Sequence, residues 1–199
     1  MHSLDSPLQP IVGKRVILFP MVPSDLSNFI KLHREDRNGF MGRFSLRNMT
    51  EDEAIRYVFA LLTTAQILAF AVITKEGKAS RRGGYVYLSD LTKYSASVSG
   101  ILDKEFARGL PKQLRLGKRT YSQDALHTVL KFCFETLNLE RVEADILENN
   151  RIIKPLLQSE GFRKEGILRN ALLTDDGLKN IVIFSLLKKE WENGENKKT

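Results

Sequence analysis

The chain has 199 residues, of which 42% are hydrophobic, enough to build a core within one domain without disulfides or metals. A single cysteine excludes an internal disulfide and a cysteine-rich zinc site, and the three histidines are too scattered for metal ligands. The net charge of +7 favours anionic ligands such as phosphorylated cofactors, but the cations are spread along the chain, which argues against nucleic acid as the partner.

The first part of the chain predicts a strand and then two helices. RVILFP (15–20) is a short apolar run that reads as a strand. Ser24 is the expected N-cap of the first helix, whose apolar residues follow with helical spacing. Thr50 and Glu53 have the spacing of a capping box, in which each side chain satisfies a free backbone donor at the start of the second helix.

Three strands are predicted next, over 67–74, 83–90 and 95–102. The third is diluted by serine and glycine and is the weakest of the set. No stretch reaches the roughly 18 apolar residues that span a bilayer, and the N-terminus lacks a signal-peptide pattern. We therefore expect a cytoplasmic protein without a membrane partner.

The second half begins with a helix over 122–139 whose apolar residues fall on one face. Cys133 lies on that face and is expected to pack in the core, because a buried free cysteine behaves as a small hydrophobe. His127 lies off the face, and no role is assigned to it. The stretch before the helix, RLGKRTYSQDAL (115–126), is cationic and contains a glycine.

RVEADIL (141–147) predicts a strand, followed by a short helix that Asn149 or Asn150 caps and Gly161 ends. Two apolar runs separated by TDDG predict a closing hairpin. The order of elements describes an α/β (α+β) domain with a mixed sheet of about seven strands flanked by about four helices. We expect one domain over 1–199, with 1–11 and 190–199 as flexible tails.

The C-terminal half carries a series of motif residues in order: Arg141, Val142, Glu143, Asn150, Gly161, Phe162, Asp176, Gly177, Ser185, Leu186, Leu187 and Trp191. This series closely resembles the C-terminal half of GNAT-superfamily N-acyltransferases, most of all the branch that contains the ribosomal-protein N-terminal acetyltransferases. VGKRVILFPMVPSDL (12–26) is also similar to that branch. The resemblance implies a single GNAT-like domain with a mostly antiparallel sheet and acetyl-CoA as the cosubstrate.

In that superfamily a glycine-rich loop and the start of the following helix hold the coenzyme pyrophosphate with backbone N–H groups and the helix dipole. The resemblance transfers this role to the end of the preceding strand, the loop and a later asparagine. The implied coenzyme-binding residues are Ile101, Leu102, Gly117, Lys118, Arg119, Thr120, Tyr121, Ser122 and Asn150.

The loop departs from the family pattern. Arg119 replaces a small residue, although its guanidinium can contact phosphate, and Thr120 is an extra residue. Ser122 takes the third small position, where its hydroxyl can cap the helix or donate to phosphate. An apparent insertion over 107–116 carries Arg108, Lys112 and Arg115, and it reads either as a cationic flap over the phosphates or as a solvated loop.

The residues at the positions of the family's catalytic groups also differ from the family pattern. The family's Asn-x-x-Ser motif ends here in Ile153, and Ser97 stands where many members have a carboxylate. Asp103, Glu105 and Glu143 remain as carboxylates near the expected site, and no catalytic residue is assigned. Water can accept the proton, because positioning alone provides much of the acceleration.

Three functions follow as hypotheses. The first is transfer of acetyl from acetyl-CoA to an amine of a protein N-terminus, a lysine or a small molecule. The second is a catalytically impaired binding protein that uses the basic 108–119 loop to contact an anionic partner. The third is acyl transfer to nucleic acid. A homodimer remains open, and the sequence does not name the acceptor.

Overall fold

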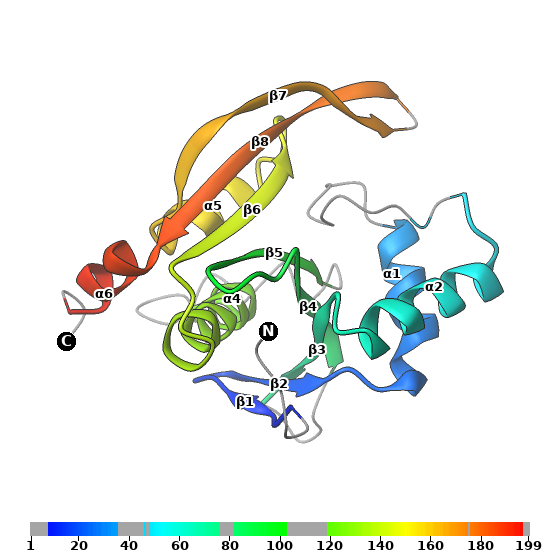
Figure 1. Cartoon of the computed structure of the whole chain (residues 1–199), viewed down its shortest axis with the longest axis horizontal. Helices are drawn as coiled ribbons and strands as arrows, with labels where there is room; N and C mark the ends of the chain where they lie inside the picture. The colour runs from blue at the N-terminus through cyan, green and yellow to red at the C-terminus, as the bar shows by residue number, and fades with distance from the viewer. Residues whose placement is uncertain are drawn as a thin grey trace, which may run out of the picture.

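The computed structural model describes residues 8–35, 46, 48–75, 82–102, 119–174 and 176–196. They form a sheet of eight strands in the order β1-β2-β3-β4-β5-β6-β8-β7, with helices on both faces (Figure 1). The predicted α/β fold with a mixed, mostly antiparallel sheet is confirmed, because every pair except β5–β6 in this described sheet is antiparallel.

The strands are β1 (Ile11–Val12), β2 (Val16–Pro20), β3 (Leu68–Thr74), β4 (Arg82–Ser89), β5 (Ser95–Leu102), β6 (Arg141–Leu147), β7 (Arg163–Thr174) and β8 (Gly177–Leu187). The helices are η1 (Pro23–Asp25, a 3-10 turn), α1 (Leu26–Glu35), α2 (Glu51–Thr63), α4 (Tyr121–Lys131), η3 (Phe132–Thr136, a π-helical turn), α5 (Ile153–Ser159) and α6 (Lys188–Asn196). The two elements that the sequence did not predict are β1, which has only two residues, and α6.

Alternating side chains divide the core into two clusters, one on each face of the sheet. On one face, α4 and α5 cover a cluster that extends from β2 to β8 and includes Val98, Val142 and Phe184. On the other face, α1 and α2 pack against β3, β4 and β5. Figure 1 shows α1 and α2 on the opposite side of the sheet from α4. We call these the α4 face and the α1 face.

The start of α1 differs from the prediction that Ser24 caps it. Ser24 lies inside η1, and the carboxylate of Asp25 instead accepts a hydrogen bond from the Val22 backbone N–H at 2.9 Å. Asp25 is 1% exposed and forms an ion pair with Arg82 on β4. An acidic side chain with both a backbone donor and a cationic partner fixes the turn more firmly than a serine hydroxyl could.

The start of α2 is as predicted. Thr50 Oγ1 accepts from the Glu53 backbone N–H at 3.3 Å, and Glu53 Oε2 accepts from the Thr50 backbone N–H at 2.7 Å. The bond from the Thr50 backbone N–H, and a further bond from the Thr50 hydroxyl to the same Glu53 oxygen at 2.8 Å, lower the pKa of Glu53.

The chain end differs from the prediction of a flexible tail from residue 190. Residues 188–196 form α6, and the Trp191 side chain is buried against Phe134, with ring centroids 5.6 Å apart. A buried tryptophan supplies enough apolar contact to hold an otherwise polar helix. Within the described ranges, no helix is long and apolar enough to span a bilayer.

Candidate functional site

The parallel pair β5–β6 is joined over only a short distance. The recorded partners are Ser95 with Arg141, Ala96 with Val142, and Ser97 with Glu143. Beyond these pairs the strands part, and β6 continues alongside β8 (Figure 1). We call the diverging segments, 98–102 of β5 and 144–147 of β6, the β5–β6 fork. Strand edges that lose their partner can hydrogen-bond an extended ligand in its place.

The start of α4 lies at the end of the sheet where the fork opens. The strand register shows which strand ends lie together. Val16, at the start of β2, pairs with the end of β3. Gly84, near the start of β4, pairs with Leu102 at the end of β5. The Asp124 carboxylate accepts from the backbone N–H groups of Arg15 at 2.7 Å and Val16 at 3.0 Å. These bonds fix the first turn of α4 at the carboxyl end of β5, the position at which open α/β sheets bind ligands.

Thr120, not Ser122, caps α4. Its Oγ1 accepts from the Gln123 backbone N–H at 3.2 Å, and Gln123 Oε1 accepts from the Thr120 backbone N–H at 2.8 Å. Ser122 lies inside the first turn, so its hydroxyl does not cap the helix, and the other role expected for it, donation to phosphate, stays a prediction. The residue that is extra by comparison with the family loop therefore has a structural role as the N-cap.

Two arginines meet beside this helix start. Arg15 Nη1 donates to the Arg119 carbonyl oxygen at 2.6 Å, and the Arg15 guanidinium lies 4.0 Å from the centre of the Tyr121 ring. The buried Nη1 of Arg119 has no hydrogen-bond partner among the described residues. A buried donor without a partner, next to a helix N-terminus, fits an anionic group such as a pyrophosphate.

The other residues expected to bind the coenzyme fall into three groups. Gly117 and Lys118 lie outside the described residues, as does the rest of 103–118. The Ile101 side chain is 4% exposed and packs in the α1-face cluster, so its side chain is committed to the core. Leu102 is the last residue of β5, and its backbone belongs to the fork.

The N-cap position of α5 is Ile152, and Asn150, not Asn149, supplies the side chain that accepts from the first backbone donors. Its Oδ1 accepts from the backbone N–H groups of Ile152 at 3.1 Å and Ile153 at 2.9 Å. The Ile153 side chain packs against the α4-face cluster. The position where the family has a hydroxyl is thus an apolar packing position here, and a coenzyme contact by Asn150 stays a prediction.

A polar network lies on the α1 face of β6. Arg141 Nε donates to Glu143 Oε1 at 2.8 Å, and Arg141 Nη1 donates to Glu165 Oε1 at 3.2 Å. The Ser185 hydroxyl donates to the same Glu165 oxygen. The hydrogen bond from Ser185 and then those from Arg141 hold the pKa of Glu165 below its usual range.

The same network acts on the guanidinium. Burial works against the charged form of Arg141, but the hydrogen bonds and charges of Glu143 and Glu165 outweigh it, and the pKa of Arg141 is raised. One cation is therefore shared by two carboxylates, and the network carries a net negative charge. This network links β6, β7 and β8 at the base of the fork, on the α1 face of the sheet.

Sequence reasoning did not predict roles for Arg15 and Asp124, which fix the start of α4, or for His127. Arg15 and Asp124 are 109 positions apart, and His127 is 33 positions from Glu160, whose Oε2 lies 2.9 Å from His127 Nδ1. The His127 ring also lies 4.8 Å from that of Trp191. Periodicity reports which face a residue occupies and carries no signal for partners so far apart in the chain.

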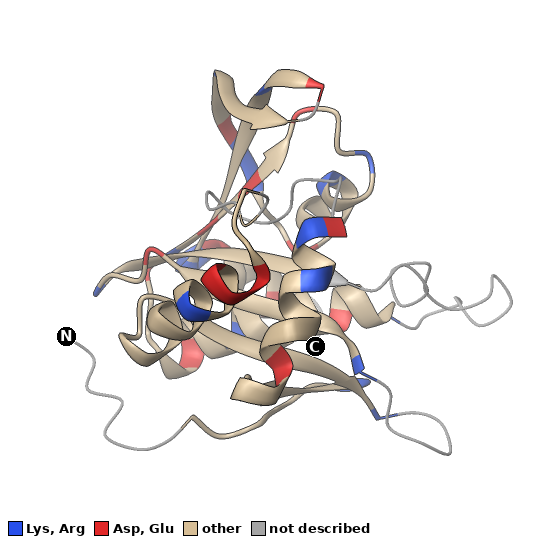
Figure 2. Cartoon of the chain, turned by 90° about the vertical axis from the view of Figure 1, so that its right-hand side faces the viewer, with Lys and Arg blue, Asp and Glu red and all other residues tan. Residues whose placement is uncertain are grey.

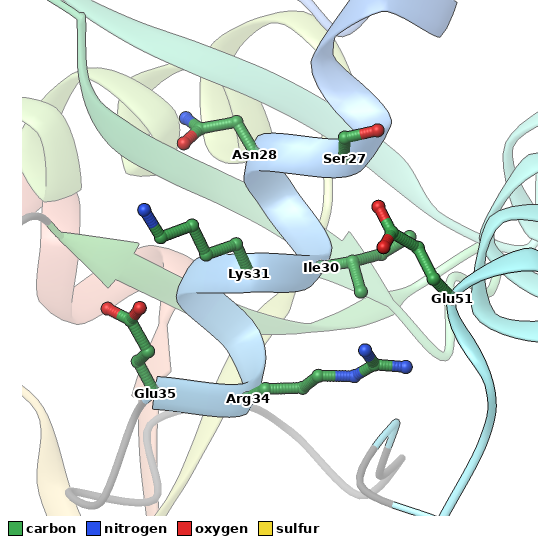
Figure 3. A pocket seen from close by; sticks show the side chains of 7 residues that line it. All are labelled: Ser27, Asn28, Ile30, Lys31, Arg34, Glu35 and Glu51. Atoms are coloured by element: carbon green, nitrogen blue, oxygen red, sulfur yellow. The ribbon is translucent and has the colours of Figure 1, made fainter.

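A pocket of about 480 Å³ lies beside α1 (Figure 3). Its lining residues are Ser27, Asn28, Ile30, Lys31, Arg34, Glu35 and Glu51. Figure 3 shows Lys31 and Glu35 on one side of the helix, and Arg34 and Glu51 on the other. The Asn28 side chain donates to the Tyr85 hydroxyl at 3.1 Å, which ties the pocket to β4. Both signs of charge line it.

Charge is mixed over the rest of the described surface as well. Figure 2 shows Lys and Arg positions interspersed with Asp and Glu over both the helices and the strands. In the described ranges no three His, Cys, Asp or Glu side chains come together in a group that could hold a metal ion.

The fork between parallel strands, the helix start beside it and the mostly antiparallel sheet define the acyl-CoA-dependent N-acyltransferase class of fold. A family profile described as "Acetyltransferase (GNAT) domain" matches residues 15–163. The chain belongs to this family, which confirms the resemblance at the level of the superfamily.

Three similar proteins agree with this placement. An uncharacterized N-acetyltransferase of Bacillus licheniformis is 35% identical over 71 residues, and the match covers 36% of this chain and only 40% of that protein. A Vibrio cholerae protein assigned as a ribosomal-protein-serine acetyltransferase is 21% identical, with a TM-score of 0.63 over 92% of this chain and 99% of that one. A spermidine N-acetyltransferase chimera from Vibrio cholerae and hSSAT is 19% identical, with a TM-score of 0.69 over 89% and 98%.

Proposed function

We propose that the chain transfers an acetyl group from acetyl-CoA to a primary amine, which attacks the thioester directly. The observation that carries the proposal is the β5–β6 fork, with the α4 N-terminus at its open end and Arg119 Nη1, which is buried and has no hydrogen-bond partner in the described part of the chain. Acetyl-CoA supplies an activated thioester carbonyl when it is bound. Arg119 and the first turn of α4 would hold its pyrophosphate, and the backbone of 98–102 would bind the extended arm.

The acceptor side is proposed to lie on the α1 face, between α1 and the β7–β8 hairpin. The pocket beside α1 and the Arg141 network both lie on this face, and both offer carboxylates to a cationic amine. The similar structures differ in acceptor, since one is assigned to ribosomal-protein serine and another acts on spermidine. The closer relation to the ribosomal-protein branch is part of this proposal and rests on the sequence motifs alone.

Donor binding is the first test. Titration calorimetry with acetyl-CoA up to about 1 mM should give a saturable heat, and the melting temperature should rise with ligand concentration because the ligand binds the folded state. A chain that shows neither response at this concentration is not an acetyl-CoA-dependent enzyme. Neither the family match nor the similar structures support the alternative of an impaired binding protein.

A further inference from the structure

Glu143 occupies the point at which β5 and β6 part. It is the partner of Ser97 in the last recorded pair before the fork, and neighbouring strands of a sheet lie about 4.8 Å apart. Its neighbours Val142 and Ala144 are buried in the α4-face cluster, so the Glu143 side chain projects to the α1 face, like that of Ser97. The side chain is partly exposed at the base of the fork.

The carboxylate is held by one oxygen. Oε1 accepts from Arg141 Nε at 2.8 Å, and within the described part of the chain no hydrogen bond to Oε2 is recorded. Arg141 is held in turn by Glu165, which the Ser185 hydroxyl contacts. Three side chains, one each from β6, β7 and β8, therefore fix the orientation of the Glu143 carboxylate and leave one oxygen to accept a proton.

We propose that Glu143 is the general base of the reaction, with Arg141 and Glu165 as positioning residues; this inference rests on the proposed acetyl transfer. An acceptor amine is mostly an ammonium ion at neutral pH and has no lone pair for attack. Glu143 Oε2 takes one proton from the ammonium. The neutral nitrogen then attacks the thioester carbon, the C–N bond forms and the C–S bond breaks. The remaining excess proton on nitrogen passes to the coenzyme thiolate, and Glu143 returns its proton to water.

The groups that face this carboxylate come from every neighbouring strand. They are Ser97 on β5, Arg141 on β6, Glu165 on β7 and Ser185 on β8. Arg141 is not paired with Glu143 alone, because it also donates to Glu165. A general base accepts a proton only in its ionised form, so the rate should fall toward acid pH.

The test compares Glu143→Gln with the matched control Glu140→Gln. Glu140 is an exposed carboxylate just before β6 and lies outside the network. Release of coenzyme A from acetyl-CoA is measured against spermidine, spermine and a library of hexapeptides with free N-terminal amines. Glu143→Gln should lower kcat/KM about 100-fold or more and remove the acidic limb of its pH profile. The acetyl-CoA affinity and the melting temperature should match those of the control.

A second variant separates catalysis from structure. Glu143→Gln combined with Ser97→Glu moves the carboxylate to the neighbouring strand at the same level of the fork. If the carboxylate acts as a base, this double variant should recover part of kcat and the acidic limb. A structural role for Glu143 would give no recovery.

Each outcome decides between the proposals. Equal kcat/KM for Glu143→Gln and Glu140→Gln overturns the role of Glu143. Binding of acetyl-CoA without turnover of any probe by the wild type also overturns it, since no acceptor is deprotonated. Absence of acetyl-CoA binding overturns the proposed function itself, and calorimetry on the wild type distinguishes this failure from the other two.

Discussion

Among single residues, Asp124 largely determines where the candidate coenzyme site forms. Its side chain is 1% exposed, and its carboxylate accepts backbone N–H groups from Lys14 at 3.3 Å, Arg15 at 2.7 Å and Val16 at 3.0 Å. Thr128 Oγ1 donates to the Asp124 carbonyl at 2.6 Å. Hydrogen bonds to a charged acceptor stabilise by about 1.5–3 kcal/mol each, so this anion joins α4 firmly to β2.

Gly13 must remain without a side chain beside this junction. A Cβ at Gly13 would collide with the Thr128 hydroxyl, would lie 2.7 Å from Asp124 Oδ2 and would crowd the Val16 carbonyl oxygen at 3.2 Å. Gly13→Ala should therefore lower the free energy of unfolding by about 1–3 kcal/mol, measured by urea denaturation. Gly166→Ala is the control, because its Cβ would meet nothing within 4 Å. Equal stability of the two variants would contradict the close packing at Gly13.

The Cys133 thiol should be unreactive toward thiol reagents in the folded protein. It is fully buried in the α4-face cluster, as the helical pattern predicted, and burial raises the pKa of its thiol far above the usual range. Because only the thiolate reacts, modification by a disulfide reagent should be at least about 100-fold slower in the native protein than in urea. Cys133→Ala, which removes the only cysteine, provides the blank. Rapid native labelling would place the thiol outside the core.

At the scale of elements, the sequence predicts most helices and strands because each carries a local signal. Alternation and apolar runs predicted the seven longer strands, and Thr50 with Glu53 predicted the start of α2. Thr120 and Gln123 have the same spacing, so the true cap of α4 could also have been found from local pattern. The two-residue strand β1 and the polar helix α6 could not, because their stability comes from distant contacts.

Helix α6 gives an element-scale prediction. Trp191 is 4% exposed and packs against Phe134 and His127, which links α6 to η3 and α4. Trp191→Ala should lower the free energy of unfolding by about 3–5 kcal/mol in urea denaturation. Glu192→Ala, on the exposed side of the helix, should change it by less than about 0.5 kcal/mol. A frayed tail, as the polar sequence suggested, would leave both variants as stable as the wild type.

At the scale of the whole molecule, the fold brings together groups that the sequence keeps far apart. Order and motif residues were enough to predict the family, while a coenzyme loop before α4 stays a prediction. They did not predict the contact of Arg15 with the Arg119 carbonyl, 104 positions away, or the sharing of Arg141 by Glu143 and Glu165. These contacts depend on strand register and on the fork, which no local pattern encodes.

Donor affinity should depend on Arg119 and on salt. Removal of a charge-assisted contact to phosphate by Arg119→Ala should weaken acetyl-CoA binding about 10-fold to 100-fold. Arg119→Lys should lose less, because it keeps the charge without the forked geometry. Arg163→Ala is the matched control, since Arg163 is exposed and pairs with Glu190 at 3.0 Å instead.

Calorimetry at about 50 mM and about 300 mM NaCl measures how much charged contacts contribute to the affinity for acetyl-CoA, because screening weakens exposed charge pairs. Wild type and Arg163→Ala should lose affinity in parallel as salt rises, while Arg119→Ala should respond less because one phosphate contact is already gone. If Arg119→Ala binds as tightly as the wild type with the same salt dependence, the buried Nη1 does not face the coenzyme. The pyrophosphate would then be held by the first turn of α4 and other cations, and the arginine at the glycine position would serve only to anchor Arg15 through its carbonyl oxygen.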